Sequence, residues 1–339
     1  MNDQKTGQPE LSSDDVAALE KLSSAYKSVG SELSKIIVGQ QDVIEQLMIA
    51  IFARGHCLLE GVPGLAKTLM VSTLARTLNL DFARIQFTPD LMPSDIVGTE
   101  VIQEDKTTGK REFKFLKGPV FSNVILADEI NRTPPKTQSA LLEAMQEHRI
   151  TVAGKTYQLE EPFFVLATQN PIEQEGTYPL PEAQLDRFMF CLNIGYPSRE
   201  EEVDILLRTT VDTNDTLNRV LGGEDILAIQ RAVRQVPVPR SVAEYTVRLV
   251  QASRPDGNTA PEAVMRYVRW GAGPRASQYL ALAGKVLAVL AGRYNVAYED
   301  IQASVKLVLR HRILTNYRAE ADQLDVEDII DQLITHVAV

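Results

Sequence analysis

The sequence predicts an α/β fold in which a parallel sheet core is sandwiched by helices and followed by an all-α domain. Apolar runs alternate with helical patterns over residues 31–195, whereas only helical patterns follow from residue 196 onward. Apolar strands separated by helices are typical of parallel sheets covered on both faces. A segment rich in glycine and proline, 61–68, also stands between an apolar run and a helical pattern. We therefore expect a tail and helix over 1–30, a core over 31–195 and a helical domain over 196–339.

The elements of the core follow from the period of the apolar residues. Strands are expected at 57–60, 82–87, 123–127, 163–168 and 189–194, and helices at 40–53, 66–78 and 134–147. Before the core, residues 1–12 have the polar composition of a disordered tail. Ser13, Asp14 and Asp15 are placed to cap a helix that runs to about Gly30.

Two segments interrupt this alternation and read as β-hairpins. Residues 99–115 form two strand-like arms around Thr107-Thr108-Gly109, and residues 149–161 do the same around Ala153-Gly154-Lys155. Neither belongs to a minimal βαβ core. Insertions that project from a rigid scaffold commonly carry function, so we expect these hairpins to do so.

The second domain has helical periodicity throughout. Helices are expected at 199–210, 224–234, 241–254, 260–269, 275–292, 299–313 and 326–337. Ser241 and Asp300 are placed like helix starts, and Pro237 and Pro239 like breaks between helices. The apolar stripe around Val286 is interpreted as core.

The segment 61–68 has the setting of a phosphate-binding loop. It reads Gly-Val-Pro-Gly-Leu-Ala-Lys-Thr, after the apolar run 57–60 and before a helix. Backbone N–H groups of such a loop and the N-terminal end of the helix attract an anion. Lys67 would reach the outer phosphates, and the Thr68 hydroxyl would bind Mg²⁺. The predicted nucleotide-binding set is Gly61, Val62, Pro63, Gly64, Leu65, Ala66, Lys67, Thr68 and Leu69.

One residue of this loop departs from the pattern G-x-x-x-x-G-K-[ST]. Ala66 stands at the position of the second glycine. A left-handed backbone costs an L-residue about 1–2 kcal/mol. We therefore expect Ala66 to have a negative φ and to point its methyl group away from the phosphates.

Two further apolar runs end in polar residues. The strand 123–127 is followed by Asp128 and Glu129, and the strand 163–168 by Gln169 and Asn170. Ligands bind at the carboxyl edge of open parallel sheets. Asp128 would hold Mg²⁺ through water, and Glu129 would polarise the attacking water. Asn170 would orient that water but cannot take up its proton.

Composition narrows the function classes. The 339 residues carry a net charge of −10, which disfavours sequence-independent binding to nucleic acids. Cys57 and Cys191 lie in apolar runs and are expected to be buried thiols, and the four histidines form no metal-ligand pattern. The first residues do not resemble a signal peptide, and the longest apolar run is too short to cross a membrane. A cytoplasmic protein without membrane insertion is expected.

Taken together, these segments resemble an AAA+ ATPase of the MoxR family. The likeness covers about residues 31–320. It rests on Ile37-Val38-Gly39-Gln40, the loop 61–68, Leu126-Ala127-Asp128-Glu129-Ile130-Asn131-Arg132, Ala167-Thr168-Gln169-Asn170-Pro171, Leu180-Pro181-Glu182-Ala183-Gln184-Leu185-Asp186-Arg187-Phe188 and Gly273-Pro274-Arg275-Ala276. Alanine at position 66 is similar to a variant loop common in that family.

The resemblance assigns roles to residues that spacing alone does not. Val38, Gly39 and Gln40 match the segment that meets the adenine. Arg187 matches the arginine finger offered to the neighbouring subunit, and Arg275 matches the sensor arginine of the lid, which reaches back to the γ-phosphate. Asn170 matches the first sensor, and Gln86 is a candidate for the polar residue that switches Glu129. The two hairpins match the helix-2 insert and the pre-sensor hairpin of this clade.

The family further implies ATP and Mg²⁺ as cofactors, a homo-oligomer that is most often a hexameric ring, and chaperone-like remodelling of protein clients. It also implies partners with von Willebrand factor A domains. Three alternatives stay open: a nucleic-acid-remodelling motor, a metal-chelatase motor subunit, and a nucleotide-gated scaffold that does not hydrolyse ATP. Arg187 could instead pair with Asp186 or Glu182, and Arg132 could sense phosphate or pair with Glu129.

Overall fold

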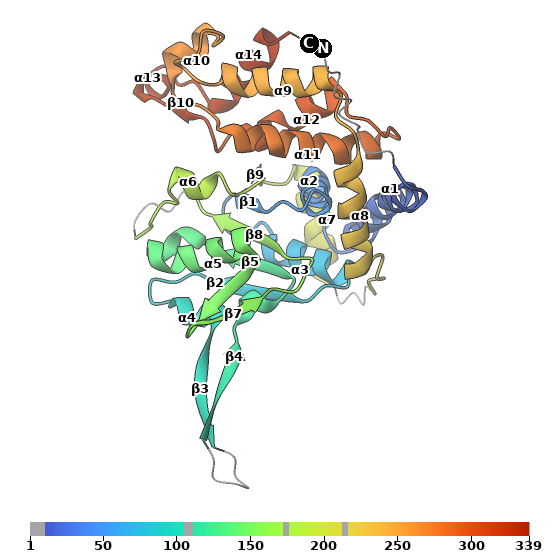
Figure 1. Ribbon diagram of the computed structural model, residues 1–339, viewed down its shortest axis with the longest axis vertical. Coiled ribbons are helices and arrows are strands. Elements are labelled where there is room, and N and C mark those ends of the chain that lie inside the picture. Colours follow the sequence, from blue (N-terminus) through green and yellow to red (C-terminus); the bar gives the residue numbers. More distant parts are fainter. Residues whose placement is uncertain (1–10, 105–110, 172–175, 212–215, 339) are drawn as a thin grey trace, which may run out of the picture.

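The computed structural model describes residues 11–104, 111–171, 176–211 and 216–338. The predicted disordered tail, up to Glu10, and the predicted turn around Thr107-Thr108-Gly109 lie outside these residues. Figure 1 shows a core that carries the sheet, a layer of helices above it and a long two-stranded arm below it.

The core is built on a five-stranded parallel sheet with the order β2-β5-β8-β1-β9. The strands are β1 (Cys57–Glu60), β2 (Phe82–Gln86), β5 (Val124–Asp128), β8 (Phe164–Gln169) and β9 (Phe190–Asn193). All five predicted strands are present, and each ends within one residue of its predicted limit. The carboxyl ends of β1, β5 and β8 lie side by side in the middle of the sheet. This edge therefore gathers the residues that follow those three strands.

Helices cover both faces of the sheet because the side chains of each strand alternate between two apolar clusters. One face packs on α1 (Ser13–Ser34), α2 (Gln41–Phe52) and α3 (Lys67–Thr77). The other packs on α5 (Pro135–Glu147) and the short α4 (Pro93–Val97). Cys57 and Cys191 are free and buried, one on each face. Their burial raises the pKa of both thiols, which favours the unreactive protonated form.

The N-cap of α1 lies one residue before the predicted cap, and the helix runs past its predicted end. Ser12 is the N-cap, and Asp15 accepts a hydrogen bond from its backbone nitrogen in a capping box. The helix continues through Gly30 to Ser34, since Val29 and Leu33 keep the apolar face that packs on the core.

The two predicted hairpins are present. The first joins β3 (Gly98–Glu104) to β4 (Arg111–Lys117), and the second joins β6 (Arg149–Val152) to β7 (Lys155–Gln158). Figure 1 shows the β3–β4 arm projecting from the core, with β7 near its root. The Phe115 and Tyr157 rings stack with centroids 4.3 Å apart, and Lys155 pairs with Glu100 at 3.1 Å. The two hairpins are thus joined at their bases.

The second domain is helical, with one departure from the prediction. Its helices are α7 (Arg199–Thr209), α8 (Gly223–Gln235), α9 (Arg240–Ala252), α10 (Glu262–Tyr267), α11 (Pro274–Leu290), α12 (Tyr298–Leu309), α13 (Tyr317–Ala321) and α14 (Val326–His336). The helix predicted over 260–269 ends at Tyr267. Its last residues form β10 (Val268–Trp270), which pairs with β11 (Leu314–Thr315). Valine and tryptophan favour extended backbone, so this prediction of a helix was wrong at its end.

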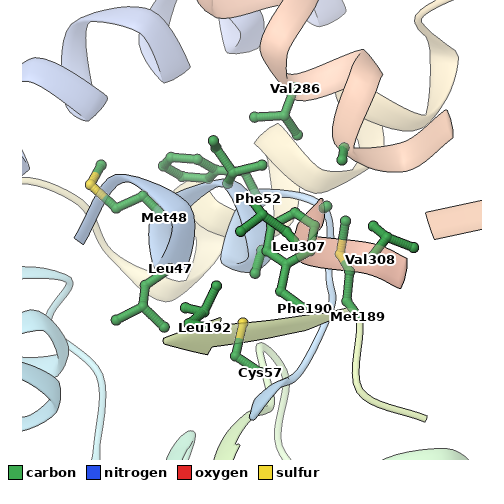
Figure 2. Packing of buried hydrophobic residues seen from close by; sticks show 14 of the residues in the cluster. Leu47, Met48, Phe52, Cys57, Met189, Phe190, Leu192, Val286, Leu307 and Val308 are labelled. Carbon is green, nitrogen blue, oxygen red and sulfur yellow. The ribbon is translucent and has the colours of Figure 1, made fainter. Parts of the chain in front are cut away.

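The helical domain is packed tightly onto the core. Figure 2 shows Val286, Leu307 and Val308 beside Phe52 and Phe190, in the cluster that also covers the sheet. Helix α8 lies against α1, where Lys21 and Asp225 pair at 2.7 Å. Nowhere in the described ranges is a helix long and apolar enough to cross a membrane.

Candidate functional site

The loop between β1 and α3 forms one wall of a cleft at the carboxyl edge of the sheet. Gly64 has a φ of +88°, and a Cβ at that position would meet no atom within 4 Å. Helix α3 begins at Lys67, directly after the loop. Backbone with open space around it, at the start of a helix, fits a phosphate group.

The structure corrects the expectation for Ala66. Its φ is +54° and its ψ is +23°, so it is left-handed rather than negative in φ. The reason lies in the start of the helix, because Ala66 is the N-cap of α3 and its carbonyl accepts from the Met70 nitrogen at 2.9 Å. Turning from the loop into the helix requires the left-handed conformation that glycine usually supplies. The strain of about 1–2 kcal/mol is offset by the packing of α3.

The predicted site residues from three strand ends meet in this one cleft, which has a volume of about 440 Å³. The residues that line it are Gly61, Pro63, Gly64, Leu65, Ala66, Lys67, Thr68, Leu69, Arg84, Gln86, Asp128, Glu129, Thr168, Gln169 and Asn170. Val62 lies within the same loop. The sequence reasoning did not select Arg84 and Thr168. The position of Arg84, two residues before Gln86 on the same strand, was the signal that could have found it.

Lys67 lies at the centre of the cleft. Its ammonium donates a hydrogen bond to the Gly61 carbonyl across the loop. Half-burial lowers the pKa of Lys67, and the negative charges of Asp128, Glu129 and Glu60 oppose that shift. Lys67 is therefore a cation among acidic groups, and it is placed to attract a polyphosphate.

Asp128 is the last residue of β5, and both of its carboxylate oxygens accept hydrogen bonds. Thr168 donates to Oδ1 at 2.6 Å, and Arg84 donates to Oδ2 from Nε at 3.0 Å and from Nη2 at 2.5 Å. Glu129 follows in a left-handed conformation, with a φ of +57°. Gln86 donates to its Oε2 at 2.9 Å, and Arg132 pairs with the same oxygen at 3.2 Å. Of the two alternatives for Arg132, the structure shows the ion pair.

Asn170 lies just beyond β8, on the opposite side of the acids from β2. It is 7% exposed and lines the cleft beside Gln169. The Thr168 hydroxyl also accepts from the Glu129 backbone nitrogen at 2.8 Å, so the ends of β5 and β8 are locked together. Asn170, which follows β8, thus lines the same cleft as both acids.

Of the predicted adenine segment, Gln40 lines a second pocket, which has a volume of about 450 Å³. Gly39 and Gln40 are both left-handed, with φ of +69° and +57°, and they lead from Val38 into α2. The Gln40 side chain donates to the Gly195 carbonyl at 3.0 Å. The sequence reasoning missed the other wall of this pocket, which includes Tyr196, Pro197, Leu307, Arg310 and Glu327. Those residues come from distant parts of the chain, so no local motif marks them.

Arg187 and Arg275 lie together, but outside the cleft of the loop. Arg275 pairs with Asp186 at 3.0 Å and does not line the cleft of the loop. The reason is the packing of α11, whose Tyr279 hydroxyl donates to the Arg187 carbonyl at 2.9 Å. The buried Arg312 also pairs with Asp186, at 2.8 Å. Asp186 is thus held by Arg275 and Arg312, which argues against its pairing with Arg187.

The Arg187 guanidinium instead donates to the Leu142 carbonyl at 3.0 Å. It lines a different cleft, formed by α5, the β6–β7 hairpin and Gln184. Among the residues that the structure describes, this cleft and the cleft of the loop have no lining residue in common. The predicted functional residues therefore fall into two groups.

Comparison with known proteins gives independent information on ancestry. Residues 56–190 match the family model described as "ATPase family associated with various cellular activities (AAA)", and residues 261–333 match the AAA lid domain. The chain is 45% identical over 307 residues to the chaperone MoxR1 of Mycobacterium tuberculosis, a match that covers 91% of this chain and 80% of that protein. It is 32% identical over 293 residues to the MoxR protein of Methylorubrum extorquens, covering 83% of this chain and 85% of the relative.

A solved structure agrees with these relatives. A protein from Cytophaga hutchinsonii, provisionally described as an ATPase, superimposes with a TM-score of 0.86 at 45% identity, and the match covers 96% of each chain. Both the αβα core and the helical lid therefore have a counterpart of known structure.

Proposed function

This chain belongs to the MoxR family of AAA+ ATPases, and from that premise we propose that it hydrolyses ATP in an oligomeric ring to remodel protein clients. The observation that carries the proposal is the single cleft that gathers the loop 61–69, the two acids and Asn170. Each of these groups has a distinct task in phosphoryl transfer to water.

The residues divide the work as follows. The backbone amides of the loop and the Lys67 ammonium bind the phosphates, and the segment Val38-Gly39-Gln40 meets the base. Thr68 and Asp128 would hold Mg²⁺, since both offer the hard oxygen ligands that it prefers. Bound there, Mg²⁺ supplies positive charge to the outer phosphates.

Glu129 is proposed as the general base for the attacking water, and Asn170 as the group that orients this water. The acid must be free of its partners to act, and in this structure Gln86 and Arg132 both engage Oε2 of Glu129. Release of these contacts would therefore accompany activation. This is the support for Gln86 as the residue that switches Glu129.

Arg187 is proposed to complete the site of a neighbouring subunit, and Arg275 is proposed as the lid arginine that senses the γ-phosphate. The position of Arg187 supports its action in trans, because it lines another cleft of the same chain and not the cleft of the loop. A guanidinium neutralises charge that develops on the γ-phosphoryl oxygens without losing a proton. The hexameric ring implied by the family would bring the two groups together.

The client and the partner are proposed more generally. The name of the mycobacterial relative, a chaperone, supports a protein client. The two joined hairpins are the proposed point of contact with that client, and a von Willebrand factor A-domain protein is the proposed partner. The net charge of −10 opposes a nucleic-acid substrate. A cytoplasmic setting, where ATP and Mg²⁺ are at hand, is part of the same proposal.

A Glu129→Gln variant tests the catalytic part. It keeps the size and hydrogen-bonding capacity of the side chain but cannot take up a proton. We expect it to bind ATP with Mg²⁺, to release phosphate at least about 100-fold more slowly than the parent, and to accumulate as assembled rings. Phosphate release and light scattering measure these outcomes. Undiminished phosphate release would refute the role of Glu129, and a parent chain that releases no phosphate would favour a nucleotide-gated scaffold.

A further inference from the structure

Arg84 lies on β2, the edge strand of the sheet, and faces the acids of the cleft. Ile85, the next residue, is 4% exposed and points into the core, so Arg84 and Gln86 share the opposite face of the strand. In the register of β2 and β5, Gln86 is paired with Asp128. The strand therefore presents a guanidinium and an amide to the two carboxylates.

The contact of Arg84 with Asp128 is close and uses two donors. Nε and Nη2 donate to the same oxygen, Oδ2, at 3.0 and 2.5 Å. Thr168 occupies the other oxygen, Oδ1. Both oxygens that could face a hydrated metal ion thus accept hydrogen bonds from the protein itself.

The same guanidinium is linked to the second acid. Arg84 Nη2 also donates to Gln86 Oε1 at 2.6 Å, and Gln86 Nε2 donates to Glu129 Oε2 at 2.9 Å. Asp128 and Glu129 are therefore tied to one cation through one amide. A carboxylate pair so close in sequence is stabilised by such a cation when no metal ion is bound.

The burial of the pair shows which partner can move. The Asp128 side chain is 15% exposed and fixed by Thr168, whereas the Arg84 side chain is 46% exposed. Arginine keeps its proton at any physiological pH, so it can leave Asp128 only by swinging away. Solvent beyond the edge strand gives it room to do so.

From this geometry we propose that Arg84 is an internal counter-cation for Asp128, which competes with Mg²⁺ for that carboxylate and so sets how strongly nucleotide binding depends on the metal. Without Mg²⁺, Arg84 neutralises Asp128 and lowers its repulsion of the phosphates. With Mg²⁺, Arg84 must first be displaced, which weakens the gain that the metal brings. The inference rests on the proposed function, because it assumes that ATP binds in this cleft.

The experiment compares the dissociation constants of the β,γ-imido analogue of ATP in excess EDTA and in excess Mg²⁺, measured by calorimetry on the full chain. The coupling between metal and nucleotide is the dissociation constant in EDTA divided by the dissociation constant in Mg²⁺, and this quotient is the ratio used below. Arg84→Gln removes the charge that neutralises Asp128 without Mg²⁺ and that must be displaced when Mg²⁺ binds. We therefore expect it to raise the ratio by at least about fivefold. Arg84→Lys keeps the charge but loses the two-donor contact, so its ratio should fall between those of the parent and Arg84→Gln.

The matched control is Arg240→Gln, which removes an equal charge from α9, where the Arg240 side chain is 92% exposed. Its ratio should equal that of the parent. A ratio for Arg84→Gln that stays within about twofold of the parent overturns the proposal and makes Arg84 an inconsequential surface ion pair. A ratio that falls also overturns it, since Arg84 would then stabilise the Mg²⁺-bound state by contacting the phosphates.

Failure of the two ideas can be told apart. If the parent chain binds the analogue in neither condition, the proposed function fails. If the parent binds but the ratio does not rise in Arg84→Gln, only the role of Arg84 fails. Should Arg84→Gln not fold, Arg84→Lys still tests the proposal, because a ratio equal to that of the parent would contradict it.

Discussion

The cleft of the loop and the cluster around Asp186 contain the two sets of predicted functional residues, and they differ in how they are built. In the cleft, the acids and Lys67 lie at the ends of rigid strands and at the start of a helix. Around Asp186, arginines from the helical domain converge on a short segment of the core. The first resembles a binding site that needs a ligand, whereas the second is held together by its own ion pairs.

The difference supports the proposal that one chain carries two halves of different sites. The cleft has the groups proposed to bind phosphate and activate water, whereas Arg187 lines another cleft. Subunit assembly would unite these halves. The variants of Arg187, Arg312 and Lys67 below each act on one half and should leave the other intact.

The largest effect is expected from Arg187→Ala. Loss of an arginine that stabilises the transition state lowers phosphate release by about 10³–10⁵-fold in related GTPases, and we expect a loss in this range. Mixing this variant with Glu129→Gln should restore part of the turnover, because each subunit supplies what the other lacks. Mixed rings with no recovered phosphate release would contradict action in trans. Arg240→Ala, far from both clefts, serves as the control.

Arg312→Met should show that the Asp186 cluster is structural as well as functional. The Arg312 side chain is 2% exposed, and it donates to the Asp186 side chain and to the Phe188 carbonyl at 2.6 Å. Removing one partner of a buried ion pair costs about 3–5 kcal/mol. The free energy of unfolding, measured by urea denaturation, should fall by that amount. A loss no larger than that of the exposed control Arg240→Met would show that the cluster adds little stability.

Acidification should destabilise the buried core around His56 rather than the cleft of the loop or the cluster around Asp186. Burial lowers the pKa of His56 to about 4, although its contact with the Met145 carbonyl opposes the shift. The unfolded chain takes up this proton near pH 6.5, so His56 contributes stability above that pH and loses it as the pH falls toward 4. The contribution is about 3 kcal/mol. Urea denaturation of the parent and of His56→Phe from pH 7 to 4 should show the smaller slope in the variant, and equal slopes would argue against it.

Lys67→Ala should affect only the cleft. A charged hydrogen bond contributes about 1.5–3 kcal/mol, so the affinity for ATP should fall by about 10- to 100-fold. Calorimetry measures this loss, and the free energy of unfolding should change little. The control is Lys35→Ala on the surface beside α1, whose ammonium pairs with Glu32 at 2.7 Å. An unchanged affinity for ATP would refute the assignment of the loop.

The sequence predicts the cleft better than the Asp186 cluster for a physical reason. The loop 61–68 and the acids after β5 are local patterns, and the parallel sheet brings strand ends together without further information. Arg312 and Tyr279 find Asp186 only through packing between domains, which no local period records. The left-handed backbone of Ala66 was not predicted, because alanine by itself favours a negative φ, whereas the start of the helix requires a positive one.

The hairpins show the same limit. Alternating residues and turn signals predict each hairpin, but not the stacking of Phe115 on Tyr157 that joins them. Likewise, the strand β10 was not predicted within an apparent helix, because its partner β11 lies later in the chain: Trp270 pairs with Leu314, 44 residues further on. Such contacts depend on the assembled fold.

Because the two hairpins are joined at their bases, a small tilt there would move the far end of the β3–β4 arm. Glu100 of β3 pairs with Phe115, and the four residues of β3 beyond Glu100 reach about 13 Å. A tilt of about 10° where Phe115 meets Tyr157 would therefore sweep the far end of β3 through about 2 Å. Strand β6 follows α5 directly, and α5 provides the Leu142 carbonyl that anchors Arg187. A shift of that guanidinium toward a neighbour would thus be passed on to the far end of β3.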